Sequence, residues 1–373
     1  MGDAYTPGLT VTGRTQVRKT RRLPLTGDVL VGVGDSVKAD QVVARTELPG
    51  KVSMVNFSNK LGVLPDEIDD ALVVVPGNPV KKGQNMAEHR SFFGLFRSRV
   101  ESPIDGTFES VSKVTGQAVL RGPPNPVEVK AYVDGVVVEV IENEGVVVET
   151  EAALVQGIFG LAGEVHAELV LVADAPDAEL VASQLEAEHR GKIIIGGGFI
   201  GLEAMKRAVE LGVAGIVVGG FSYQNVKELL GYDVGVAVTG TEELGTTLVL
   251  TEGFGGIAMA KATFELLARH NGRQASMSGA TQIRAGVIRP EIIIPDPIDA
   301  DDAELDAAVP GLEVGAPVRC IRAPHFGKIG KIASLPVELK RMQSETMVRV
   351  VEVDFGSGPG VEIPRANVEV IER

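Results

Sequence analysis

The strongest constraint on the fold of this chain is a change in the periodicity of its hydrophobic residues partway along the sequence. Between residues 9 and 159, short runs of β-branched residues are broken by Gly, Pro, Asn and Asp, a pattern typical of antiparallel strands and hairpins. Between residues 168 and 295, continuous apolar runs alternate with helical patterns, which indicates parallel strands covered on both faces. We therefore expect a multidomain protein that combines α/β and all-β parts.

The length of 373 residues supports several domains, because one compact core rarely grows that large. We predict a β-rich domain over residues 1–160, a Rossmann-like α/β domain over 165–295, an acidic linker over 296–310 and a small β-barrel over 311–373. In the α/β domain, the predicted strands cover residues 169–173, 193–195, 216–218, 234–238, 247–250 and 292–294. The predicted helices cover residues 178–188, 201–211, 223–230 and 259–270.

One phrase occurs twice in the β-rich part. Residues 34–41 (GDSVKADQ) are echoed by residues 77–84 (GNPVKKGQ), and Asp-Gly turns recur in 102–107 (SPIDGT) and 133–136 (VDGV). Asp-Gly favours reversals that need a positive φ. These phrases resemble the hairpins of the biotinyl/lipoyl and barrel-sandwich-hybrid families over residues 25–155. That resemblance implies a prosthetic group only where a lysine lies at a hairpin tip in the family motif. This region has no such lysine, so the resemblance implies a rigid docking module.

The C-terminal segment carries a second resemblance. Residues 314–319 (VGAPVR), 324–332 (PHFGKIGKI) and 361–371 (VEIPRANVEVI) are similar to the KOW-type, SH3-like barrel of the bacterial NusG family of transcription elongation factors. The chain departs from that family at His325, since Gly-Pro usually precedes the aromatic residue there. The resemblance implies binding to ribosomal, polymerase or RNA partners without catalysis. Its candidate partner-binding residues are His325, Phe326 and Lys328.

A motif of the phosphate-binding type follows the strand predicted at 193–195. Gly196, Gly198 and Gly201 have the G-x-G-x-x-G spacing at the start of a helix, where free N–H groups favour an anion. Residues 192–204 resemble the NAD-binding turn of flavin-linked disulfide reductases, which implies NAD(P) binding. However, the next strand ends in VVGGF and lacks the acid that would hold the ribose. We favour the alternative, a turn whose glycines let the helix pack closely on its strand.

Other predicted strand ends are also rich in Gly and small polar residues. Ligands of open α/β sheets bind outside the carboxyl ends of strands, so these loops would form a glycine-lined pocket if they converge. Its charged members would be Glu252 and Arg284. Strand-to-helix turns are commonly glycine-rich for packing reasons, and both interpretations stay open. An acid and a base without a nucleophile or metal ligands do not define a reaction.

The remaining candidates favour structural roles. The five histidines lack metal-binding spacing, and Cys320 lies in an apolar strand pattern typical of a core. Residues 92–96 (FFGLF), bracketed by arginines, are interpreted as a packed loop, with an exposed anchor for a protein or membrane surface as the alternative. A basic run near the N-terminus is interpreted as a solvated strand face and consists of Arg14, Arg18, Lys19, Arg21 and Arg22.

Composition narrows the function classes. A net charge of −14 argues against binding free DNA, because phosphate neutralisation needs surplus Lys and Arg. A single cysteine excludes a disulfide scaffold. The chain has no signal-peptide pattern and no apolar run of the roughly 18 residues that a membrane helix needs, so we expect a cytoplasmic protein without a transmembrane segment.

Two functions follow from these patterns. The first is a non-catalytic scaffold or adaptor that docks onto a protein partner or a large assembly, in transcription, in translation or by self-assembly. It needs no cofactor, and RNA contact through the C-terminal barrel and homo-oligomers would both fit it. The alternative is a nucleotide- or dinucleotide-binding protein, such as an oxidoreductase using NAD(P). Whether the chain is an enzyme stays open, and we favour a non-catalytic role.

Overall fold

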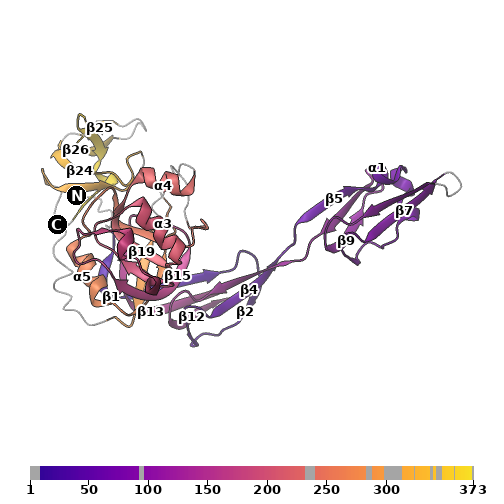
Figure 1. The fold of residues 1–373 in the computed structure, drawn as a ribbon, viewed down its shortest axis with the longest axis horizontal. Coiled ribbons are helices and arrows are strands. Elements are labelled where there is room, and N and C mark those ends of the chain that lie inside the picture. Colours follow the sequence, from indigo (N-terminus) through magenta and orange to yellow (C-terminus); the bar gives the residue numbers. More distant parts are fainter. Residues whose placement is uncertain are drawn as a thin grey trace.

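The computed structural model describes residues 9–91, 96–231, 240–282, 288–297, 313–322, 324–336, 339–341, 347–356 and 358–371. Its described part is rich in strands that form several sheets. A rounded body contains the strands nearest the two ends of the chain, and a long arm leads from it to a separate globular module (Figure 1).

The body is built on one thirteen-stranded mixed sheet. Its strands run in the order β14 (Phe159–Leu161), β20 (Thr247–Phe254), β19 (Gly215–Phe221), β17 (Ile193–Ile195), β15 (Glu164–Leu171), β21 (Gln274–Ser278), β22 (Glu291–Pro295), β13 (Gly145–Gln156), β12 (Gly135–Ile141) and β3 (Ser36–Val37). Off this path, β1 (Val11–Arg22) pairs with β13, β18 (Phe199–Ile200) pairs with β19, and β16 (Glu179–Leu180) pairs with β18. Strands from the segments 1–160 and 165–295 therefore share a single sheet.

Only the centre of this sheet is parallel. Strands β15, β17, β19 and β20 are paired parallel. Strand β14 pairs antiparallel with β20, and on the other side each of the pairs β15–β21, β21–β22 and β22–β13 is antiparallel. Helices α3 (Leu202–Leu211) and α4 (Tyr223–Leu230) pack on one face, and α5 (Lys261–Arg269) packs on the other. Successive strand residues alternate between the two faces of the sheet. Ile194 therefore joins the hydrophobic core beneath α3 and α4, and Ile193 joins the core beneath α5.

Most of the predicted elements are confirmed here. Helices α3, α4 and α5 and strands β15, β17, β19, β20 and β22 lie where the rhythm placed them, whereas the strand predicted at 234–238 lies outside the described residues. The helix predicted at 178–188 is wrong. That segment forms β16 and two 3-10 turns, Ala182–Gln184 and Ala187–His189. The Gln184 side chain accepts a hydrogen bond from the N–H of Val181, and the His189 ring accepts one from the N–H of Glu186. Such side-chain bonds to the local backbone compete with helix formation.

A second sheet closes the base of the arm. It has the order β11 (Asn125–Lys130), β4 (Val42–Leu48), β2 (Asp28–Val29), and it encloses a valine-rich core together with β12 and the adjoining parts of β1 and β13. We call this unit the proximal module.

The distal module, residues 50–122, is inserted between β4 and β11. Its main sheet has the order β5 (Val52–Asn56), β10 (Gln117–Arg121), β9 (Gly106–Val111), β6 (Pro79–Val80), and a separate hairpin pairs β7 (Asn85–Ser91) with β8 (Phe96–Glu101). Helices α1 (Phe57–Leu61) and α2 (Ile68–Ala71) complete it. Its core, which includes Phe57, Phe108 and Leu120, contains residues of this module alone.

The C-terminal segment forms a small antiparallel sheet with its own core, as predicted in outline. We call it the C-terminal sheet; its strands are β23 (Pro317–Cys320), β24 (Ile329–Ser334), β25 (Leu339–Arg341), β26 (Met347–Asp354), β27 (Val361–Pro364) and β28 (Val368–Val370). Cys320 is buried in that core, which confirms its predicted role, and burial raises the pKa of its thiol to about 12. Residues 298–312, most of the predicted acidic linker, lie outside the described residues.

Candidate functional site

The glycine turn after β17 is filled by neighbouring backbone. Gly196 and Gly198 are buried, and their N–H groups donate to carbonyl oxygens of β19 (2.9 Å) and of Ala178 (2.8 Å). A Cβ on Gly198 would lie 2.9 Å from the Ile257 carbonyl oxygen. Short strand β18 follows, and α3 begins only after Gly201, its N-cap. Close packing therefore accounts for the glycines, and two of the N–H groups expected to bind phosphate are engaged within the protein.

Glu252 is buried in an internal ion-pair network. One carboxylate oxygen accepts from the N–H of Ala260 (3.0 Å), and the other accepts from Nη1 of Arg319 in β23 (3.2 Å). Arg319 Nε also donates to Glu369 (2.9 Å). The structure thus brings Glu252 to the C-terminal sheet. Arg284, its expected neighbour, lies outside the described residues.

The C-terminal sheet covers the carboxyl end of β20. Arg319 Nη1 donates to the carbonyl of Thr251 (2.5 Å), and the N–H of Phe254 donates to the carbonyl of Gly327 (3.1 Å). A Cβ on Gly253 would lie 2.8 Å from that same carbonyl oxygen. The strand end at which a ligand of an α/β sheet would be expected is therefore occupied by another part of the chain.

The three predicted partner-binding residues differ in exposure. Phe326 is half-buried and packs against the core of the body. His325 is half-buried with its ring 5.6 Å from that of Phe355, and burial lowers its pKa. Lys328 is exposed, with Nζ 5.8 Å from the centre of the Phe355 ring. Of the three, only Lys328 faces solvent freely.

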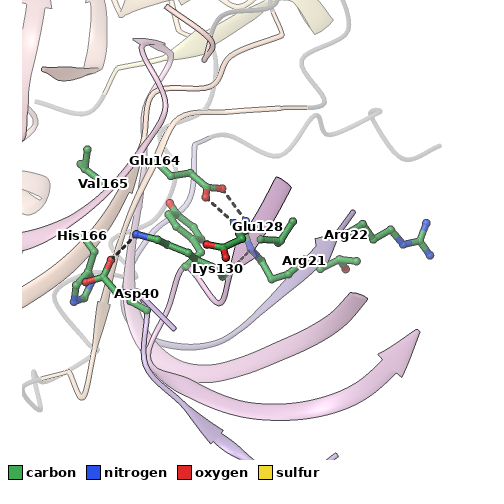
Figure 2. Close-up of a pocket in the computed structure, with 12 residues that line it drawn as sticks. Arg21, Arg22, Asp40, Glu128, Lys130, Glu164, Val165 and His166 are labelled. Atoms are coloured by element: carbon green, nitrogen blue, oxygen red, sulfur yellow. Dashed lines mark hydrogen bonds and ion pairs between the residues drawn. The ribbon is translucent and has the colours of Figure 1, made fainter. Parts of the chain in front are cut away.

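A polar cleft of about 480 Å³ lies where the proximal module meets β15 (Figure 2). Its lining residues come from β1, β11, β15 and the turns beside them: Thr20, Arg21, Arg22, Ala39, Asp40, Glu128, Val129, Lys130, Tyr132, Glu164, Val165 and His166.

Charges in the cleft pair with one another. Arg21 forms a bidentate ion pair with Glu164, both contacts at 2.7 Å, and Lys130 Nζ lies 3.4 Å from Asp40 (Figure 2). Arg21 also donates to the Lys130 carbonyl (2.7 Å) and stacks over the ring of Tyr132 at 5.2 Å. Arg21 therefore links β1, β11 and β15 across the junction.

Tyr132 shows how tightly this junction is built. It is buried with a positive φ of 74°, uncommon for a residue other than glycine. Burial, followed by nearby Glu291 and Glu164, raises the pKa of its phenol well above the ordinary value. Burial thus favours the neutral, protonated phenol. No group of three metal-ligating side chains occurs among the described residues. With its cations paired, the cleft is best suited to holding the proximal module against the body.

The proximal and distal modules prove to be two copies of one unit. In both, the lysine and the glutamine of the repeated phrase form two hydrogen bonds: Lys38 with Gln41, and Lys81 with Gln84. The lysine N–H donates to the glutamine side-chain oxygen, and the glutamine N–H donates to the lysine carbonyl oxygen. The Asp-Gly turns correspond as well, since Asp134 accepts from Ala39 (2.7 Å) as Asp105 does from Lys82 (2.9 Å). A register shift also occurs in both copies at the corresponding place of the next strand pair, β12–β13 in the proximal module and β9–β10 in the distal module.

This correspondence shows how the arm is built. β4 and β11 of the proximal module match β7 and β8 of the distal module, so the distal module is inserted where the proximal hairpin would have its tip. The sequence phrases signalled the duplication, but they did not reveal this nesting. The sequence also gave no signal for the roles of Arg319 and Tyr132, which depend on distant contacts.

The distal hairpin lies at the end of the arm (Figure 1). Arg90, Arg97 and Arg99 surround Glu88, and the hydrogen bond from Arg97 is the main cause that lowers the pKa of Glu88 to about 2. All three arginines remain exposed. Residues 92–95, most of the aromatic cluster, lie outside the described residues.

By contrast, the N-terminal basic run is neutralised. Each of its five cations faces a carboxylate: Glu151, Glu149, Glu291, Glu164 and Glu144.

The helices of the described residues are all too short and polar to cross a bilayer. No family model and no curated protein matches this chain.

Proposed function

We propose that this protein is a non-catalytic adaptor that presents its distal module to a macromolecular partner. The observation that carries the proposal is the distal module itself, which has a complete core and stands away from the body on a narrow stalk (Figure 1). In this proposal the repeated modules are of the barrel-sandwich-hybrid type, the body contains a Rossmann-like unit, and the C-terminal sheet is a KOW-type barrel turned toward the body.

The stalk is suited to a fixed spacer. Its two segments, 49–51 and 122–124, contain Pro49, Pro123 and Pro124, which restrict φ. A Cβ on Gly50 would lie 2.1 Å from the Gly122 carbonyl oxygen, so the segments cross in direct backbone contact. A stiff crossing holds the module at a set distance and orientation, which an adaptor requires.

Crosslinking with mass spectrometry, on full-length protein in extract of its source cells, tests this proposal. We expect crosslinks to a partner at the distal lysines Lys51, Lys60, Lys81, Lys82 and Lys113. A chain in which residues 51–121 are replaced by a two-residue turn should stay folded and lose that partner. Partner crosslinks confined to the body would contradict the proposal.

The nucleotide-binding alternative has a separate test. Native mass spectrometry with added NAD, NADP, FAD and ATP should show the bare chain if the protein is an adaptor. One nucleotide bound per chain would instead favour the alternative and direct attention to the body.

A further inference from the structure

The outer strand of the distal sheet has an unpaired edge. Among the described residues, β5 pairs only with β10. The Gly122 N–H donates to the Lys51 carbonyl (2.9 Å), so by antiparallel alternation Lys51, Ser53 and Val55 direct their backbone groups to β10. Val52 and Met54 then direct theirs outward. Their side chains are 43% and 67% exposed, so this edge is both unpaired and apolar.

The duplicated module supplies an internal comparison. The matching registers align β5 with β1, placing Val52 at the position of Arg18 and Met54 at that of Thr20. On β1, Arg18 is exposed and bound to Glu149 (2.5 Å). Charged side chains on outer strands oppose pairing with another chain. The distal copy has no charge at either of the two aligned positions.

The charge distribution indicates which molecule can meet this edge. The distal module contains nine Lys and Arg against eight Asp and Glu, a net charge of +1, which leaves −15 on the rest of the chain. Two bodies therefore repel each other, whereas two nearly neutral distal modules repel each other only weakly. The arm also keeps the bodies apart when the modules touch (Figure 1).

We propose that the distal module binds the distal module of a second copy through antiparallel pairing of β5 with β5. Pairing centred on Ser53 places Val52 of each strand opposite Met54 of the other. The outward backbone groups of both residues are then bonded reciprocally, and the four side chains form one apolar patch. The inference rests on the proposed function, since it names a second copy as a partner of the presented module. The contact is small, so a weak, concentration-dependent dimer is expected.

Analytical ultracentrifugation of the full chain over a range of concentrations tests this proposal. The unmodified protein should form dimers as concentration rises, and Met54→Lys should remain monomeric. Thr20→Lys, at the aligned position of β1, is the matched control and should dimerise normally. Both sites are on the surface, so circular dichroism should show two folded variants. A monomer at all concentrations, or equal dimerisation of both variants, would overturn the proposal.

A crosslink tests the register. Ser53→Cys should form a disulfide-linked dimer under mild oxidation, while Cys320, which is buried, stays unreactive. Gln117→Cys, on the neighbouring strand, should not crosslink. Absence of the Ser53→Cys dimer would refute the pairing. If the chain stays monomeric but another protein crosslinks to the distal module, the adaptor proposal stands and this inference fails. Dimerisation through β5, with all other partners crosslinked to the body, would support this inference and contradict the adaptor proposal.

Discussion

At the scale of single residues, buried charge is concentrated where the C-terminal sheet meets the body. The side chains of Arg319 and Glu252 are 7% and 4% exposed, and Glu369 is nearly as buried. Ions removed from water must be paired to be tolerated. Glu252, which the sequence suggested as a ligand for a nucleotide, instead contributes to the attachment of the C-terminal sheet.

Replacement of Arg319 should therefore be costly. Arg319→Met leaves Glu252 buried without its cation, and we expect a loss of about 3–5 kcal/mol in the free energy of unfolding. Urea denaturation measures it. Arg45→Met is a suitable control, because its pair with Asp28 is exposed and should contribute less than about 1 kcal/mol. Similar losses in both variants would contradict this account.

His270 should make stability depend on pH. The residue is buried at the end of α5, its Nδ1 lies 2.8 Å from the Leu266 carbonyl oxygen, and burial lowers its pKa below 6.5. Below pH 6.5 the unfolded chain binds a proton more readily than the folded chain, so stability should fall as pH falls. The loss has a maximum slope of about 1.4 kcal/mol per pH unit.

Thermal unfolding between pH 7.5 and 5 measures this effect. His270→Gln should unfold with a shallower pH dependence than the unmodified chain over that range. His325, whose pKa is also lowered, should contribute in the same direction, so His325→Gln serves as a comparison. An unchanged slope in His270→Gln would show that another group is responsible.

At the scale of elements, the distal module has the features of an independent unit. Its buried residues contact one another across β5, β9, β10 and the β7–β8 hairpin, and its chain enters and leaves through adjacent stalk segments. Such an insertion resembles a domain placed in a surface loop, where the ends of the insert lie close together.

We therefore expect residues 50–122 to fold when expressed alone. Two-dimensional ¹H–¹⁵N NMR should show the dispersed signals of a single packed structure, and heating should give one cooperative transition. The sequence with Phe108→Ala, which opens a cavity in the core, should lose about 3–5 kcal/mol and act as the control for core dependence. Collapsed or absent dispersion in the unmodified segment would show that it needs the proximal module.

At the scale of the whole molecule, the two copies of the module have different surroundings. The proximal copy shares its β13 with the body and closes a polar junction through Arg21. Among the described residues the distal copy has no such contact with the body, and its exposed apolar side chains include Met54, Leu64, Val75 and Val114. In the proposed function, the same unit serves once as a structural base and once as a presented surface.

The orientation of the arm should depend on Gly50. A side chain there cannot coexist with the Gly122 carbonyl, so Gly50→Val should force the two stalk segments apart. Small-angle X-ray scattering should show a changed distance distribution at long distances. The unfolding transitions of body and distal module should be preserved. Gly77→Val, an open position with a strained φ, tests whether any bulky substitution in the arm has the same effect. An unaltered scattering curve would contradict a stalk fixed by backbone contact.

The sequence by itself determined the local structure of much of this protein. Hydrophobic periodicity was sufficient to locate α3, α4, α5 and the central strands, since burial of one helix face or both strand faces is written in neighbouring residues. The turn phrases revealed the duplicated unit for a similar reason. Asp-Gly turns and the Lys–Gln contacts are short-range, so they persist in both copies. The prediction of a helix at 178–188 was wrong because side-chain hydrogen bonds to the backbone outweighed helix propensity.

Only the tertiary structure decided how these elements serve one another. The nesting of one module in the other, the burial of Glu252 against Arg319 and the filling of the turn at Gly198 all depend on contacts between residues distant in sequence. A glycine pattern is compatible with an open anion site and with close packing alike, because both require the absence of a side chain. Only the occupant of the space beside it separates them, and that occupant comes from another part of the chain.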